Sequence, residues 1–182
     1  MRDIYLGDSY DLVKRFWSEN LRSIAPLFAH PKFVPSWIKD RYTTLTKIPL
    51  LDPDSLPNNP FAIFLDPHTG IPLPSESLKG STVSHASLLF IVEINKEYRP
   101  SYMICFDQSY HRRHQLTKER QREAKRAFLR EQGIASFYYI SHAPFLFMAE
   151  KDATLVAVRG CLIELGIPEK TSRTIRLEVI MS

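Results

Sequence analysis

The fold class is decided by the stretch Phe61-Ala62-Ile63-Phe64-Leu65-Asp66-Pro67-His68-Thr69-Gly70. Its first half is a continuous apolar run with turn-forming residues on both sides, which is typical of a strand buried on both faces, as in a parallel sheet. The run Tyr102-Met103-Ile104-Cys105-Phe106 has the same character and is again followed by an acid, Asp107. We therefore expect two buried strands, each with a carboxylate directly after its carboxyl end.

The turn 66–70 is the first candidate site, because ligands of open α/β sheets gather at the carboxyl ends of the strands. Gly70 allows a backbone conformation that other residues avoid, so the chain can turn sharply there. Asp66 would act as a hydrogen-bond acceptor, a base or a metal ligand, with Pro67 and His68 beside the substrate. The alternative is a strand-ending turn in which Asp66 caps nearby amides.

Strands and helices alternate along the rest of the chain. Apolar periodicity and capping residues predict helices over 9–23, shortly after Pro35, over 117–132 and over 152–165. Short apolar segments predict strands over 3–6, 27–30 and 174–180, and an antiparallel pair near an edge over 137–140 and 145–148. The run 87–94 fits either a buried strand or a buried helix. The alternation predicts an α/β layered fold, and 182 residues fit one domain, 1–182.

The composition is that of an ordinary globular protein. Hydrophobic residues make up 44% of the chain, so a substantial core can form without disulfides. Cys105 and Cys161 both lie in apolar runs and are predicted to be buried thiols. No apolar stretch approaches the ~18 residues that cross a bilayer, and the first residues lack a signal-peptide core. We expect a cytoplasmic protein that has no membrane partner.

Positive charge is concentrated between His111 and Gln132. Eight Arg/Lys and three Glu give this segment a charge of +5, which leaves about −1 for the rest of a chain of net charge +4. The predicted helix has a thin apolar face, Ala124, Ala127 and Phe128, so most of its surface is expected to meet water or a partner. Such an element suits a polyanion such as RNA or DNA, and it equally suits a solvated helix.

Two further clusters have competing interpretations. Asp11 and Lys14, three residues apart at a helix start, are on physical grounds an exposed pair worth about 0.3–0.5 kcal/mol. Between the second buried strand and the basic helix, His111 lies three residues from His114, a weak spacing for a metal pair. Arg112 and Arg113 suit phosphate contacts better than His111 suits a metal, and a solvated loop is an equal alternative.

The glycines exclude several nucleotide-binding classes. The six glycines are Gly7, Gly70, Gly80, Gly133, Gly160 and Gly166. No two of them are two residues apart, so neither a dinucleotide fingerprint nor a phosphate-binding P-loop is present. A Gly-x-Ser-x-Gly nucleophile elbow is also absent.

Three patches together resemble a known family. Gly7-Asp8-x-x-Asp11-x-x-Lys14 is similar to the Gly-Asn-x-x-Asp-x-x-Lys opening of the bacterial methyltransferases that modify an adenine amine in large-subunit ribosomal RNA. Ala62–Pro67 resembles the strand that leads into their Asp-Pro-Pro-Tyr motif. The order of elements from Tyr102 to Met148 resembles their C-terminal half. A group of uncharacterised relatives with a Gly-Asp-x-x-Asp-x-x-Lys start is closer still.

The resemblance implies a Rossmann-like, mostly parallel sheet with helices on both faces and an S-adenosylmethionine cofactor. Asp66 would accept a hydrogen bond from the target amine, with Lys14 and Asp11 in the same catalytic group. Two departures are visible. His68 and Thr69 replace the second proline and the aromatic that stacks on the flipped base. The segment 29–32 stands in place of the glycine-rich cofactor loop.

Three hypotheses follow. The first is a methyltransferase-related protein that acts on nucleic acid, with Asp66 central and the basic segment 112–130 on phosphates. The second is a metal-dependent nuclease or phosphodiesterase that uses Asp66, Asp107 and His111. The third is a non-catalytic module that binds nucleic acid or protein, because the motifs of the resemblance are degraded.

Overall fold

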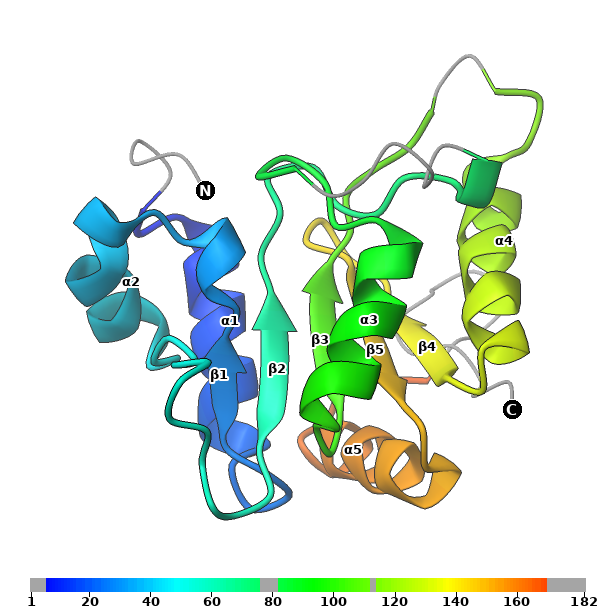
Figure 1. Cartoon of the computed structure of the whole chain (residues 1–182). Coiled ribbons are helices and arrows are strands. Elements are labelled where there is room, and N and C mark those ends of the chain that lie inside the picture. Colours follow the sequence, from blue (N-terminus) through cyan, green and yellow to red (C-terminus); the bar gives the residue numbers. More distant parts are fainter. Residues whose placement is uncertain (1–5, 76–81, 112–113, 170–182) are drawn as a thin grey trace.

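A five-stranded sheet organises the molecule, and helices cover both of its faces (Figure 1). The computed structural model describes residues 6–75, 82–111 and 114–169. The strands are β1 Leu27–Ala29, β2 Ala62–Leu65, β3 Met103–Phe106, β4 Ala135–Tyr139 and β5 Phe145–Ala149. Their order is β1-β2-β3-β5-β4. The first three are parallel, while β5 is antiparallel to both of its neighbours. The predicted α/β fold, a mostly parallel sheet with helices and an antiparallel pair at one edge, is confirmed.

The strand β2 lies in the middle of the parallel part and is buried along its whole length. Ala62 and Phe64 belong to the core on one face, and Ile63 and Leu65 to the core on the other. This alternation explains the continuous apolar run, since a strand covered on both sides has no polar face. β3 is built in the same way.

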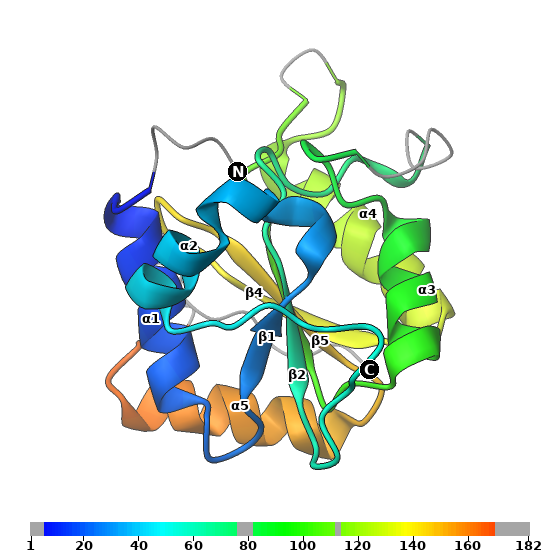
Figure 2. The same cartoon turned by 60° about the vertical axis from the view of Figure 1, so that its left-hand side comes forward.

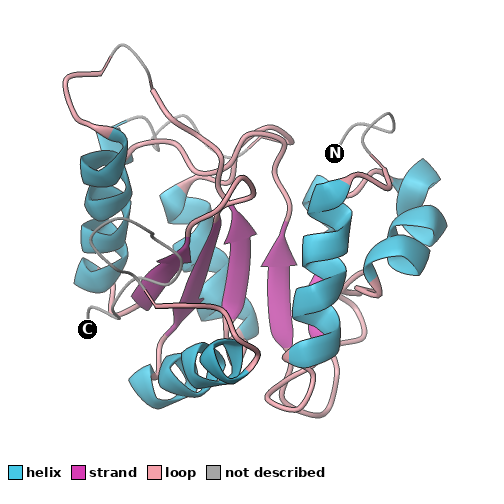
Figure 3. Ribbon diagram, turned by 180° about the vertical axis from the view of Figure 1, so that it is seen from behind, coloured by secondary structure: helices cyan, strands magenta, loops and turns pink. Residues whose placement is uncertain are grey.

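The helices divide between the two faces. They are α1 Ser9–Asn20, α2 Lys39–Thr46, α3 Leu88–Tyr98, α4 Lys118–Glu131 and α5 Asp152–Glu164, with short 3₁₀ turns at Pro31–Phe33 and Ser36–Ile38. α1, α2 and α5 pack on one face, and α3 and α4 on the other (Figures 2 and 3). Within the described ranges, every helix is too short or too polar to cross a membrane.

The ambiguous run 87–94 is a helix. Ser87 begins it as the N-cap, and its hydroxyl accepts a hydrogen bond from the amide of Phe90 at 3.2 Å. α3 then places Leu88, Ile91 and Val92 against the sheet. The predicted strand 174–180, and most of the predicted strand 3–6, lie outside the described residues.

The expectation for the basic helix was wrong in one respect. α4 exposes only part of its charged surface, since it buries Gln121, Arg122, Lys125 and Arg126 together with Leu129. The cause is a set of polar partners on the sheet: Lys125 meets a carboxylate, and Arg122 lies 5.4 Å from the centre of the Tyr138 ring. The exposed cations of this helix are Lys118, Arg120 and Arg130.

The two cysteines differ in burial. Cys105 is fully buried in β3, as predicted, whereas Cys161 in α5 is only partly buried, and both are free thiols. Burial raises the pKa of Cys105 well above its ordinary value, with Asp107 and Asp66 adding to the effect. Cys105 is therefore a core residue.

Candidate functional site

A cavity of about 460 Å³ opens at the carboxyl ends of β2 and β3. It lies where α1 begins and where the turn 66–70 leaves the sheet, so its position agrees with the general location of ligand sites in α/β sheets. Its lining is made of Asp8, Tyr10, Lys14, Asp66, Pro67, His68, Thr69, Ser84, Phe106 and Gln108. The structure thus brings Asp66 and Lys14 together, 52 residues apart in sequence.

The floor of the cavity is a buried ionic cluster. Lys14 Nζ donates hydrogen bonds to Asp66 Oδ2 at 2.8 Å and to Asp11 Oδ1 at 2.9 Å. The three residues are between 2% and 4% exposed. The expectation of an exposed Asp11–Lys14 pair was therefore wrong, because the helix spacing did not show that Asp66 faces it. Asp11 Oδ2 also accepts a hydrogen bond from the amide of Gly7 at 2.7 Å.

The start of α1 holds this cluster in place. Asp8 is the N-cap, and its Oδ1 accepts hydrogen bonds from the amides of Tyr10 at 2.9 Å and Asp11 at 3.2 Å. A capped first turn fixes the helix register, so Asp11 and Lys14, three residues apart, share the face that meets β2.

The charge balance of the cluster is negative. Burial alone would lower the pKa of Lys14, but Asp66 and Asp11 outweigh it and raise that pKa, so the lysine stays protonated. Burial, followed by the charges of Asp66 and Asp11, raises the pKa of Tyr42 well above its usual value, so the phenol stays neutral. Two carboxylates then face one ammonium group. The floor favours a ligand that brings N–H donors over one that brings an anion.

Aromatic rings form one wall of the cavity. Tyr10 and Phe106 have ring centroids 5.5 Å apart, and His142 from the β4–β5 loop stacks on Tyr10 at 5.6 Å with planes 22° apart. Gln108 Nε2 donates a hydrogen bond to the Tyr10 hydroxyl at 3.2 Å. A flat ligand would meet an apolar surface here and polar groups at the floor.

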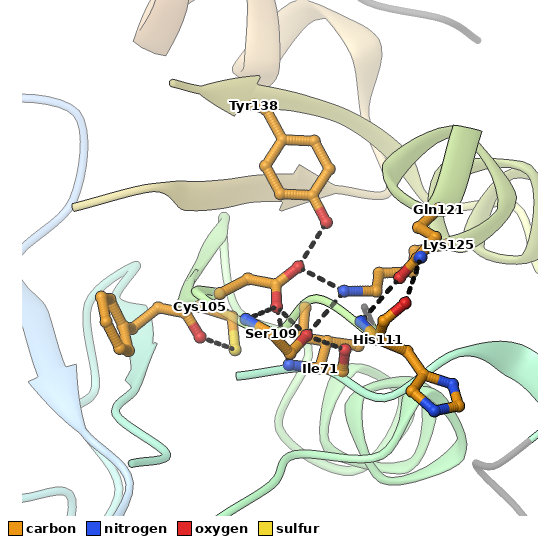
Figure 4. A network of polar contacts seen from close by, with 9 residues as sticks. Ile71, Cys105, Ser109, His111, Gln121, Lys125 and Tyr138 are labelled. Carbon is orange, nitrogen blue, oxygen red and sulfur yellow. Dashed lines mark hydrogen bonds and ion pairs between the residues drawn. The ribbon is translucent and has the colours of Figure 1, made fainter. Parts of the chain in front are cut away.

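Asp107 serves a different purpose from Asp66, although both follow parallel strands. It is 2% exposed and lies outside the first cavity. Its Oδ1 accepts from the amides of Ile71 at 2.9 Å and Ser109 at 3.2 Å, and its Oδ2 from Lys125 at 2.8 Å and Tyr138 at 2.6 Å (Figure 4). With its oxygens occupied in this way, Asp107 acts as an anchor for the surrounding loop rather than as a substrate-binding group.

Asp107 is expected to make the fold sensitive to acid. Burial alone would raise the pKa of Asp107, but Lys125, the amide of Ile71 and Ser109 outweigh it and lower the pKa below the ordinary 3.8. A carboxyl whose pKa is lower in the folded state stabilises the fold fully above the unfolded value, and this contribution is lost as pH falls toward the folded value. Urea titrations from about pH 6 to pH 3 should show a steeper loss in the native protein than in Asp107→Asn.

The control for this measurement is Asp54→Asn, which removes an exposed carboxylate. It should keep the native pH dependence and the native stability near neutral pH. Parallel pH profiles for the native protein and Asp107→Asn would contradict the anchoring role.

Gly70 lies against this anchor. Its φ is +125°, and a Cβ atom added to it would come within 2.6 Å of the Cα of Asp107 and closer still to Asp107 Oδ1. The glycine is therefore required by the close approach of two backbone segments as well as by its conformation. The prediction that Gly70 makes a special turn is supported, although its role is structural.

The remaining predicted residues fall in a second cavity or outside the described chain. His111 lines a cavity of about 210 Å³ next to the first, together with Thr69, His85, Ser109 and Lys125 among others. Arg112 and Arg113 lie outside the described residues.

Four residues that line the first cavity were not predicted from the sequence: Tyr10, Ser84, Phe106 and Gln108. Tyr10 and Phe106 had a weak signal as aromatic neighbours of Asp11 and Asp107, whereas Ser84 lies in a loop without any pattern.

The acidic residues do not form a metal centre in the described part of the chain, where no group of three or more His, Cys, Asp or Glu is placed to hold an ion. Asp66 and Asp107 each bind their own buried lysine, Lys14 and Lys125. A cation would have to displace those lysines, so this arrangement does not support the nuclease hypothesis.

The implied S-adenosylmethionine does not fit the loop after β1. That strand runs into His30, whose ring centroid lies 5.3 Å from that of Phe90 and 6.0 Å from that of Phe33. Burial, and then the charge of Lys32, lowers the pKa of His30 to about 4, so the ring stays neutral. Aromatic side chains pack where a glycine loop would leave room for the cofactor.

No family model, no curated protein and no solved structure matches the chain.

Proposed function

We propose that the protein binds nucleic acid by taking up an unpaired base that carries an exocyclic amine, as a relative of the RNA adenine methyltransferases without their cofactor loop. The observation that carries the proposal is Asp66, a buried carboxylate held by Lys14 at the floor of an open cavity with an aromatic wall. Its partners would be RNA or DNA.

Hydrogen-bond chemistry supports an amine as the recognised group. An ionised carboxylate only accepts hydrogen bonds, and Lys14 occupies one oxygen of Asp66. A base amine brings N–H donors to this floor, while a carbonyl at the same place would set an acceptor against an acceptor. In a desolvated site such a mismatch costs about 1–3 kcal/mol.

The aromatic wall supports a planar ligand. Base stacking on an aromatic side chain contributes about 1–3 kcal/mol and depends little on the base. Tyr10 and Phe106 come from α1 and β3, so the wall does not depend on position 69, where the resemblance places the aromatic of the related enzymes. Stacking would thus provide affinity, and Asp66 would provide the choice between amine and carbonyl bases.

The resemblance is consistent with this geometry. It implied that Asp66 and Lys14 belong to one pocket, and both line the first cavity. The order of elements on which the resemblance partly rests, a strand, a basic helix and an aromatic hairpin, is the order of β3, α4 and the β4–β5 pair. A Rossmann-like origin of the fold is part of the proposal.

Calorimetry with nucleosides tests the proposal. Adenosine and cytidine, which carry the amine, should bind about tenfold more tightly than inosine and uridine, which carry a carbonyl at the same ring position. Asp66→Asn should abolish this preference, because the amide can both donate and accept. Asp52→Asn, an exposed change in the loop between α2 and β2, should leave the preference intact. Equal affinity for adenosine and inosine in the native protein would reject the proposal.

A further inference from the structure

The two cavities adjoin across a ridge made of three chain segments. Thr69 lines both cavities. In each of the other two segments, neighbouring residues face opposite ways: Ser84 and Gln108 line the first cavity, and His85 and Ser109 line the second. The amide of Thr69 donates to the carbonyl of Ser84 at 2.9 Å, which ties the ridge together.

The charges of the two cavities differ. The first is lined by the carboxylates Asp66 and Asp8 and by one cation, Lys14, which also pairs with the buried Asp11. The described lining of the second contains no carboxylate. Asp107, which is absent from that lining, forms an ion pair with the lining residue Lys125. An anionic group would therefore be disfavoured in the first cavity and tolerated in the second.

Hydrogen-bond donors gather in the second cavity. His85, His111 and Tyr110 bring ring N–H and hydroxyl groups to its lining, and Thr69 brings a hydroxyl from the ridge. Lys125, 1% exposed, donates to Asp107 and to Ser109 Oγ at 2.8 Å each, so a cation lies at the base of this cavity. Donor groups around a partly enclosed space suit the oxygens of a phosphate group.

We propose that the second cavity is a phosphate subsite that holds the phosphate group of the nucleotide whose base lies on Asp66. The sugar then crosses the ridge at Thr69. This inference rests on the proposed function, and it adds that the ligand is a nucleotide rather than a free base or nucleoside. The same phosphate chemistry is supplied by a free nucleotide and by a nucleic-acid strand.

The test compares adenosine with its 5′- and 3′-monophosphates by calorimetry at constant salt. One of the two monophosphates should bind about tenfold more tightly than adenosine. In the double variant His85→Ala/His111→Ala this gain should vanish while the affinity for adenosine stays unchanged. The hydrogen bonds to Gln121 use the backbone of His111, and the bridge to Gly70 uses the backbone of His85, so the replacements leave these contacts intact.

Two further variants separate the subsites. Asp66→Asn should lose the preference for amine bases and keep the gain from the phosphate. Arg22→Ala, which removes an exposed cation just past the far end of α1, should keep both properties. A short single-stranded oligoadenylate that binds more tightly than either monophosphate supports the subsite with nucleic acid as the source, and equal binding supports it with a free nucleotide as the source.

The two proposals fail in different ways. If neither monophosphate binds more tightly than adenosine, or if the gain persists in the double histidine variant, the phosphate subsite is overturned. If the phosphate gain depends on the histidines while adenosine and inosine bind equally, the subsite stands and the proposed role of Asp66 is wrong.

Discussion

Lys14→Met is expected to lower the free energy of unfolding by about 3–5 kcal/mol. The methionine fills a similar volume but leaves Asp11 and Asp66 buried without the ammonium group that lies 2.9 Å and 2.8 Å from them. Removing one partner of a buried ion pair is costly because the remaining charge stays desolvated. Urea denaturation at neutral pH measures the loss.

The adjacent residue provides a matched control. Arg15 forms an ion pair with Glu19 at 2.8 Å on the exposed side of the same helix, where both side chains are about half exposed. Arg15→Met should cost only about 0.3–0.5 kcal/mol, since water screens the pair. Similar losses for Lys14→Met and Arg15→Met would mean that the cluster beneath the cavity has no special electrostatic role.

Gly70→Ala is the second change with a large expected effect, about 4 kcal/mol or more. The new methyl group would overlap the backbone of Asp107, and neither segment can move without breaking the bond from the amide of Ile71 to Asp107. Thermal or urea denaturation measures the loss, and circular dichroism shows whether the variant folds at all.

Gly133→Ala separates the steric effect from the conformational one. Gly133 also has a positive φ, +75°, but a Cβ atom there would meet nothing within 4 Å. Its replacement should cost only the strain of the left-handed conformation, about 1–2 kcal/mol. Equal losses at Gly70 and Gly133 would argue against the close approach of the turn 66–70 to Asp107.

The buried strands could be predicted because their signal is local. A strand covered on both faces must be apolar at every position. The apolar run alone therefore predicts the strands at Phe61–Leu65 and Tyr102–Phe106, without knowledge of the elements that pack against them. The helix 117–132 could be predicted for the same reason, since Thr117 and Gly133 mark its ends. Local capping did not settle the run 87–94, whose apolar residues suit either structure.

The burial of charged residues could not be predicted, because it depends on partners far away in the chain. Lys14 meets Asp66 across 52 residues, and Lys125 meets Asp107 across 18. Helix spacing shows which side chains share a face but not what lies opposite. In the sequence, a lysine that will be buried therefore cannot be distinguished from a solvated one until the carboxylate that pairs with it is known.

The candidate site could be predicted in part. The turn 66–70 was identified from the strand that precedes it, and the grouping of Asp66 with Lys14 came only from the resemblance. Ser84, His85 and Gln108 gave no signal, because loops that line a cavity need no periodic pattern.

The bonds around Asp107 also bear on how tightly a ligand can be held. One carboxylate joins the loop at Ile71, the end of β3, the helix α4 and the edge strand β4. The ridge between the two cavities is thereby held in place before any ligand binds. A rigid receptor loses little conformational entropy on association. For this reason a small ligand with few polar contacts can be bound selectively, because the entropic cost of ordering the protein on binding is small.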